Sequence, residues 1–375
     1  MKNKIPCKKK EECCGCMACY NICPFSAIEI VNSFEGFMLP KINEKKCVKC
    51  GLCYQTCPVI NEIHSNDLDL AFAAYAKSQQ IRYYSSSGGI FSVIANKIID
   101  LNGVVFGAAF DNSFNVSHVS AGNKDEIIKL RGAKYLQSNI GRIYINVKNE
   151  LLKNRIVYFI GTPCQIAGLR AYLNKDYNNL ICSDLICHGV PSPKIWDKYL
   201  NEKISNASNV SFRDKRYGWT NYSLVLNSTQ KEIILNGQNN TFMEGFINNY
   251  FLRESCYNCK FKGYKRLGDI TLADFWGIDK IISDFDENNS GTSLILINSE
   301  KGKILFDSIQ QEIIYKKVNR KEALKYNLSA IQSSYRPIQR TRFFKNIEKK
   351  SYEQNLIEIK KLNLKEKILI RIKKG

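Results

Sequence analysis

Residues 13–58 carry one cysteine pattern twice, and this pattern limits what the segment can fold into. Each run reads C-x2-C-x2-C-x3-C-P, first over 13–24 and again over 47–58. Three thiolates two residues apart can bind three irons of one iron–sulfur cube, while the fourth, placed before a proline, reaches a second cube. A segment with this spacing is expected to fold around two inorganic clusters.

The doubled run is the signature of two-cluster bacterial ferredoxins. It predicts two 4Fe-4S clusters, each bound by three cysteines of one run and the last cysteine of the other. The first cluster set is Cys13, Cys16, Cys19 and Cys57. The second cluster set is Cys47, Cys50, Cys53 and Cys23. Zinc also accepts C-x2-C pairs, but it closes with looser spacings and needs no trailing Cys-Pro. Cys7 and Cys14 fall outside the spacing and are interpreted as packing or surface thiols.

A chain of 375 residues has room for a larger unit behind this segment. From Leu70 onward, apolar strands such as GVVFGAAFD and RIVYFIG alternate with helical stretches such as GGIFSVIANKIIDL. Three later segments, VSFRD, NYSLVLN and KEIILN, favour antiparallel pairing, so a mixed sheet is expected. The fold class is therefore α+β and α/β: a dicluster ferredoxin-like domain over 1–62, a mixed-sheet α/β domain over 70–310, and a basic, mostly helical extension over 311–375.

The formal net charge of +20 is concentrated near the C-terminus. Residues 312–375 hold 18 Lys or Arg against 6 Asp or Glu, a net +12. We interpret this segment first as a solvated helical surface, and second as a contact for an acidic partner or an anionic membrane surface. No zinc-finger, RRM or KH pattern supports nucleic-acid binding.

The expected compartment is the cytoplasm. The basic extension could also hold the protein against the inner face of the membrane. The first residues, MKNKIPCKKK, contain no apolar signal region, and no apolar run approaches 18 residues. Cluster ligation also requires reduced thiols.

Four further cysteines, the third cysteine set, are weak signals one by one: Cys164, Cys187, Cys256 and Cys259. Cys164 follows a predicted strand where a helix begins, which favours a thiolate. Cys187 ends the next strand, so both side chains can emerge at one sheet edge. The residues alone leave four interpretations open: a third cluster, a zinc site, a redox-active dithiol, or unconnected buried cysteines. Cys182 is interpreted as a core residue.

Several passages in the chain resemble one family. They are SSGGIFSVIANKIIDLNGVVFGAAF, LRGAKYLQS, VYFIGTPCQIAGLRAYL, DLICHGVPSPKIWDKYL, SFRDKRYGW and SCYNCKFKGYKRLGDITLADFWGI. This order resembles the coenzyme F-420 hydrogenase/dehydrogenase beta-subunit family, in its bacterial form with an N-terminal dicluster ferredoxin. The resemblance runs from about Cys13 to Lys280. It implies that 70–310 is a flavoprotein domain with FAD and a third 4Fe-4S cluster, and the cluster cysteines of the family fall on the third cysteine set.

The resemblance also implies flavin contacts. Ser85–Phe91 joins a strand to a helix whose first amides could bind a pyrophosphate, although by itself the segment fits a tight turn equally well. The family segment assigns Ser86, Ser87, Gly88 and Gly89 to the flavin, and a second segment adds Lys134 and Tyr135. Without the resemblance, Lys134 would be a solvated loop lysine.

Four residues are expected near the third cluster or the flavin: Thr162, Gln165, Asp274 and His188. His188 is a weak catalytic candidate because it could relay a proton, but a histidine beside a ligand more often donates to sulfur. No other catalytic residue is predicted.

Two functions compete. One is an iron–sulfur flavoprotein oxidoreductase that passes electrons between clusters, FAD and a hydride-exchanging substrate, which could be the deazaflavin coenzyme, a sugar intermediate, a quinone-like acceptor or a partner protein. The other is a non-enzymatic relay between redox partner proteins. A radical enzyme would need a C-x3-C-x2-C triad, which is absent from the sequence.

Overall fold

The two cysteine runs fold into similar halves joined by a hairpin. In the computed structural model, which describes residues 10–63 and 68–361, each run contains one short helix that begins after a left-handed residue, Met17 in the first run and Gly51 in the second. Between the runs the chain forms an antiparallel strand pair, in which Ile28 lies opposite Ile42 and Asn32 opposite Met38. The elements of this unit are η1 Lys10–Glu12, α1 Ala18–Ile22, β1 Ile28–Asn32, β2 Met38–Ile42 and α2 Leu52–Gln55.

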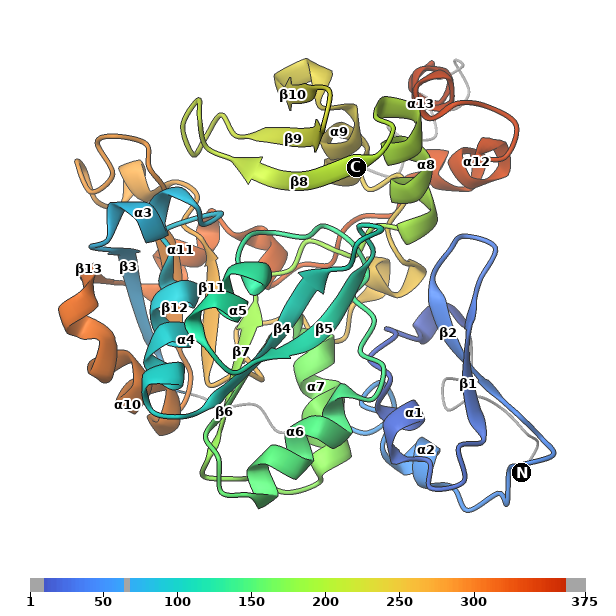
Figure 1. Cartoon of the computed structure of the whole chain (residues 1–375), viewed down its shortest axis with the longest axis horizontal. Helices are drawn as coiled ribbons and strands as arrows, with labels where there is room; N and C mark the ends of the chain where they lie inside the picture. The colour runs from blue at the N-terminus through green and yellow to red at the C-terminus, as the bar shows by residue number, and fades with distance from the viewer. Residues whose placement is uncertain (1–9, 64–67, 362–375) are drawn as a thin grey trace.

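A mixed sheet forms the centre of the larger unit (Figure 1). Its order is β13-β3-β12-β11-β7-β6-β4-β5, with the four strands β11, β7, β6 and β4 parallel and the flanking pairs antiparallel. The predicted mixed-sheet fold class is therefore confirmed. The strands are β3 Leu70–Ala76, β4 Val104–Phe110, β5 Val116–Ala121, β6 Val157–Gly161, β7 Leu180–Leu185, β11 Ile270–Asp274, β12 Ser293–Ile297 and β13 Ile313–Val318.

Helices cover both faces of this sheet. Ile90, Val93 and Ile98 on α4 recur at helical spacing and pack with α5 and α10 on one face. On the other face, Tyr144 of α6 and Ile166 of α7 share a core with Met17 and Ala18 of the ferredoxin-like unit. The helices around the sheet are α3 Gln79–Tyr83, α4 Ile90–Asp100, α5 Lys124–Leu130, α6 Ile143–Leu152, α7 Pro163–Leu173, α10 Glu300–Ile309 and α11 Arg320–Lys325.

The three segments that favoured antiparallel pairing form a separate three-stranded sheet, β10-β9-β8, rather than a part of the large one. Four helices pack on it around Trp196, Phe242 and Tyr352. In Figure 1 this layer lies above the main sheet. Its elements are α8 Pro193–Lys203, β8 Ala207–Asp214, β9 Ser223–Ser228, β10 Glu232–Asn236, α9 Thr241–Ile247, α12 Gln339–Asn346 and α13 Tyr352–Lys360.

The segment 311–375 is divided between these layers as far as the structure describes it. β13 pairs with β3 at the edge of the main sheet, whereas α12 and α13 join the upper layer. Short helical turns complete the chain: η2 Gly237–Asn239, η3 Glu254–Asn258, η4 Ile278–Lys280, η5 Gln310–Glu312 and η6 Leu328–Ala330. None of the helices in the described part of the chain has the length and apolarity of a membrane span.

The ferredoxin-like unit sits directly on α7. Gly168 faces the first run, and a β-carbon built at this position would lie 2.8 Å from Cβ and 3.1 Å from Sγ of Cys16. Such distances exclude any side chain without a shift of the unit. The hydrogen atom at Gly168 therefore sets how closely the first run approaches the large domain.

Candidate metal centres and the adjoining cavity

The first cluster set comes together as the crossed connectivity predicts. All four of its cysteines line one small cavity of about 20 Å³, although Cys57 belongs to the second run. Burial raises the pKa of the Cys19 thiol, and the nearby Cys13 and Cys57 raise it further. All four thiols are buried.

The second cluster set also gathers, but near the surface. Burial raises the pKa of Cys53, with further contributions from Cys23, Cys47 and Cys50. Cys50 is exposed and the other three thiols are partly buried. Cys23 therefore lies with the three cysteines of the other run, as the crossed assignment expects.

The donor chemistry of both sets fits iron–sulfur clusters. Thiols whose neighbours and burial raise their pKa values hold negative charge only when a cationic partner compensates it, and a coordinated thiol is deprotonated outright. Within residues 10–63 and 68–361, no three His, Cys, Asp or Glu side chains are arranged to hold a single metal ion. A cubane does not need that arrangement, because each thiolate binds a different iron.

The third cysteine set gathers at the sheet edge that the sequence analysis predicted. β6 and β7 are parallel neighbours with Gly161 opposite Asp184, so Cys164 and Cys187 follow adjacent strand ends. Burial raises the pKa of Cys187 to about 12, and Cys164 and Cys259 contribute. Burial also raises the pKa of Cys256, and the neighbouring Cys187 raises it further. The four thiols are thus electrostatic neighbours. Thiolate donors suit both a third cluster and zinc, but among the described residues the side chains are not arranged around a single ion as zinc would require.

Local structure fixes the first member of this set. Pro163 occupies the first turn of α7, and a capping box closes the helix start, where Oε1 of Gln165 accepts from the Thr162 N–H at 2.9 Å. Cys164 is therefore the second residue of the helix, where the dipole favours a thiolate. The Thr162 hydroxyl lies 3.1 Å from the Cys164 sulfur.

Cys14, which the sequence analysis set aside, links two of the thiol groups. The pKa of its thiol is raised well above the usual value, chiefly by the neighbouring Cys16 of the first cluster set, while the neighbouring Cys164 of the third set acts in the opposite direction. Arg253 lies at the same junction and donates from Nε to the Cys13 carbonyl at 2.7 Å and from Nη2 to the Met38 carbonyl at 3.1 Å. The contacts of Arg253 join residues more than 200 positions apart, which explains why no local pattern indicated them.

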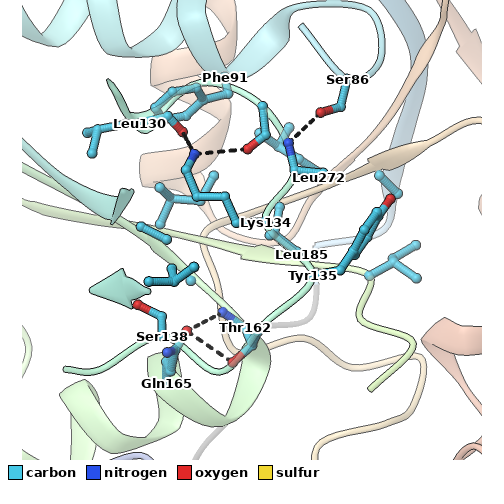
Figure 2. A pocket seen from close by; sticks show the side chains of 18 of the residues that line it. Ser86, Phe91, Leu130, Lys134, Tyr135, Ser138, Thr162, Gln165, Leu185 and Leu272 are labelled. Carbon is cyan, nitrogen blue, oxygen red and sulfur yellow. Dashed lines mark hydrogen bonds between the residues drawn. The ribbon is translucent and has the colours of Figure 1, made fainter. Parts of the chain in front are cut away.

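A cavity of about 300 Å³ opens where the parallel strands end. Cys14 and Cys164 form part of its wall, and Ser86, Ser87 and Gly89 form another part. Figure 2 shows Ser86 on one side of the view and Thr162 with Gln165 on the other. The volume is in the range of small-molecule sites, and carboxyl ends of parallel strands are where such sites form.

The predicted phosphate segment faces this cavity in part. α4 begins after Gly89, whose φ of 88° is left-handed, and no side chain caps its first amides. The Ser86 hydroxyl accepts from the Ala133 N–H at 2.6 Å, which leaves its proton available as a donor. Gly88 is not among the described residues that line the cavity; a β-carbon there would lie 2.5 Å from the Ala74 carbonyl oxygen, so this glycine permits close packing on β3.

Lys134 and Tyr135 both line the cavity. The Lys134 ammonium donates to three carbonyls at the end of α5, of Leu130, Arg131 and Gly132, at 3.3, 2.9 and 3.2 Å, two of which are drawn in Figure 2. Burial lowers the pKa of Lys134 to about 7. This lysine is therefore not the solvated loop residue that its segment alone would suggest.

Asp274 also lines the cavity, and its carboxylate accepts hydrogen bonds from Nη1 and Nη2 of Arg213 at 2.8 and 3.2 Å. Arg213 donates in addition to the Tyr135 hydroxyl at 3.1 Å. Since the carboxylate is already paired with a buried guanidinium, its evident role is to hold Arg213 and Tyr135 in place.

Two of the three histidines, His118 and His188, lie in the described part of the chain and play different parts. His118, which the sequence analysis did not single out, lines the cavity with Nδ1 2.7 Å from the Ser138 hydroxyl and Nε2 3.1 Å from the Ile160 carbonyl. Burial lowers its pKa to about 4, so the ring is neutral near pH 7. His188 is not among the described residues that line the cavity, and its Nε2 lies 2.6 Å from Oδ1 of Asn249.

Comparison with known proteins identifies two families along the chain. Residues 154–322 match the family described as the C-terminal part of the beta subunit of coenzyme F420 hydrogenase/dehydrogenase, and residues 12–61 match the 4Fe-4S dicluster domain. No curated protein matches the chain. A chain of the F420-reducing NiFe hydrogenase complex from Methanosarcina barkeri is similar at 13% identity and a TM-score of 0.48, over 78% of this chain and 99% of that one.

The dicluster match confirms the prediction that the N-terminal unit holds iron–sulfur clusters. Residues 154–322 therefore resemble the C-terminal part of coenzyme F420 hydrogenase/dehydrogenase beta subunits and follow a 4Fe-4S dicluster domain, so the chain is an iron–sulfur electron-transfer protein of the oxidoreductase type that is related to these subunits.

Proposed function

We propose that this protein is an iron–sulfur flavoprotein oxidoreductase in which two ferredoxin clusters and a third cluster serve a flavin in the 300 Å³ cavity. One observation carries the proposal. The cavity wall contains Cys164, a predicted cluster ligand, and also the uncapped start of α4, a place suited to a phosphate group. A single chamber therefore adjoins both an electron source and an anion site.

The lining fits FAD in its chemistry. Apolar side chains such as Phe91, Leu130 and Leu272 suit the faces of a flat ring, while the Ser86 hydroxyl and the α4 amides suit a pyrophosphate. FAD, when bound, would combine single electrons into pairs and exchange them as a hydride. The chain itself supplies orientation, exclusion of water and local charge.

Lys134 and His118 would control charge around such a flavin. An anionic group close to the Lys134 ammonium would favour its protonated form, because its pKa of about 7 leaves both forms accessible at neutral pH. His118 is held neutral, and its contacts with Ser138 and Ile160 fix the ring. His118 therefore supplies a rigid polar wall and not a proton at pH 7.

Burial orders the three thiol groups. The second cluster set reaches the surface, the first is buried, and Cys14 joins the first to the third beside the cavity. This gradient supports a path that begins at the second set and ends in the cavity. The substrate that we propose to test first is the deazaflavin coenzyme, because the matched family carries its name; a redox partner protein or another hydride-exchanging molecule is the next choice.

The test is anaerobic purification with iron, sulfide, zinc and flavin quantified. We expect about twelve iron atoms per chain, one FAD and no zinc. About eight iron atoms with one zinc would make the third cysteine set a zinc site. Clusters without flavin would overturn the flavoprotein proposal in favour of a relay.

A pair of variants tests whether the flavin occupies this cavity. Ser86→Leu fills its wall, so flavin content should fall while iron content stays at the wild-type value. Ser113→Leu, a matched change at an exposed turn, should leave both unchanged. Flavin retained at the wild-type level in Ser86→Leu would move the flavin site elsewhere.

A further inference from the structure

One cluster ligand is open to solvent. Among the fourteen cysteines of the described chain, Cys50 is the exposed one, whereas every thiol of the first cluster set is buried. Electron transfer between proteins weakens steeply with distance, so a carrier must come close to a cluster. The surface around Cys50 is where an outside protein can do so.

The surroundings of Cys50 have the composition of a docking site. We use the name Cys50 patch for its exposed apolar and basic residues: Phe25, Val48, Leu52, Tyr54, Lys41, Lys45, Lys46 and Lys49. Val48 and Tyr54 are 57% and 49% exposed, although each is adjacent in sequence to a cluster ligand. Glu44 is the single acidic residue between positions 41 and 55. An apolar centre with a charged rim is typical of transient protein interfaces.

We propose that the Cys50 patch docks a small acidic one-electron carrier protein. The carrier would lose one electron and the cluster on the second cluster set would gain it, with no bond formed or broken. Four lysines against two exposed glutamates, Glu44 and Glu29 opposite Lys41, leave a net positive charge that complements an acidic surface. The exposed apolar residues lie next to the ligands in sequence, where close contact shortens the electron path. The proposal rests on the ferredoxin clusters and does not depend on the flavin.

The experiment uses the holoprotein and a dithionite-reduced acidic ferredoxin with two 4Fe-4S clusters as probe. The variant K45E/K46E/K49E is compared with K129E/K316E/K317E, which changes the net charge equally at exposed lysines of the large domain. In anaerobic stopped-flow at low ionic strength, we expect the patch variant to react about tenfold more slowly than the control variant, and the difference to shrink with added salt.

Two controls separate docking from cluster damage. Iron content and direct reduction by dithionite should be the same in all proteins. If the charge-reversed patch loses iron, K45Q/K46Q/K49Q replaces it, with a smaller expected slowing. Equal rates for the patch and control variants would overturn the proposal. Loss of binding to anionic vesicles without any change in the carrier rate would assign the patch to a membrane and overturn it as well.

Discussion

The two halves of the ferredoxin-like unit share their cysteine spacing and differ in their surroundings. Met17 and Gly51 occupy the same position in the two runs, and both are left-handed, with φ of 60° and 81°. Met17 buries its side chain in the core shared with α6 and α7, whereas the space around Gly51 is open. Burial against the large domain stabilises a strained conformation that the exposed half leaves to glycine. Ligand spacing therefore builds both sites, and packing decides which of them faces the outside.

The largest expected effect separates the halves by their ligands. Cys19→Ser should remove the first cluster and also lower the unfolding free energy, because Cys19 lies in a buried site that packs against the large domain. Cys50→Ser should remove about four iron atoms and leave the large domain as stable as in the wild type. Iron analysis and anaerobic urea unfolding measure the difference. Equal destabilisation by the two variants would contradict the comparison.

A second effect concerns the junction beside the inner half. Arg253→Gln leaves the carbonyls of Cys13 and Met38 without this donor, which should cost roughly 2–4 kcal/mol of unfolding free energy. Removing the positive charge should also lower the midpoint potential of the first cluster and leave that of the second unchanged, as read by EPR during redox titration.

Lys260→Met is the matched control for Arg253→Gln. Lys260 also ties the large domain to the ferredoxin-like unit, through one hydrogen bond of 2.9 Å to the Val59 carbonyl. This partly buried bond should be worth about 1 kcal/mol, so its loss should destabilise the protein less than Arg253→Gln does. A shift of both potentials by Arg253→Gln would show a general distortion instead of a local charge effect.

The smallest effect is a pH dependence on the cavity side. His118 has a pKa of about 4 in the folded protein, against about 6.5 when unfolded, so the unfolded chain takes up a proton first as the pH falls. Stability should therefore drop on acidification below pH 6.5, by about 1 kcal/mol at pH 5.5. His118→Gln should remove this part of the drop, as measured by urea unfolding at pH 7.5 and 5.5.

No histidine occurs in residues 1–62, so this response belongs to the large domain. An unchanged pH difference in His118→Gln would mean that other groups cause it. In Cys50→Ser, which alters the second half of the ferredoxin-like unit, the difference in unfolding free energy between pH 7.5 and 5.5 should be the same as in the wild type.

The sequence predicted the parts of this molecule that depend on spacing along the chain. Cysteine spacing placed the two ferredoxin sets, and strand ends placed Cys164 and Cys187 at one sheet edge. Residues that act through long-range contacts were missed: Cys14 and Arg253 at the cluster junction and His118 in the cavity wall. Antiparallel strands were recognised, but alternation alone could not tell that they form their own sheet.

Gly168 carries a consequence for how such fused chains can change. The first run lies against this glycine so closely that even a methyl group would push the two modules apart, while all twelve predicted cluster ligands stayed in place. A substitution there would give a protein with its full complement of iron but with slow electron transfer from the ferredoxin-like unit to the large domain. Slow electron transfer in a protein that holds all its clusters would show that the absence of a side chain at one helix position sets the distance between the two modules.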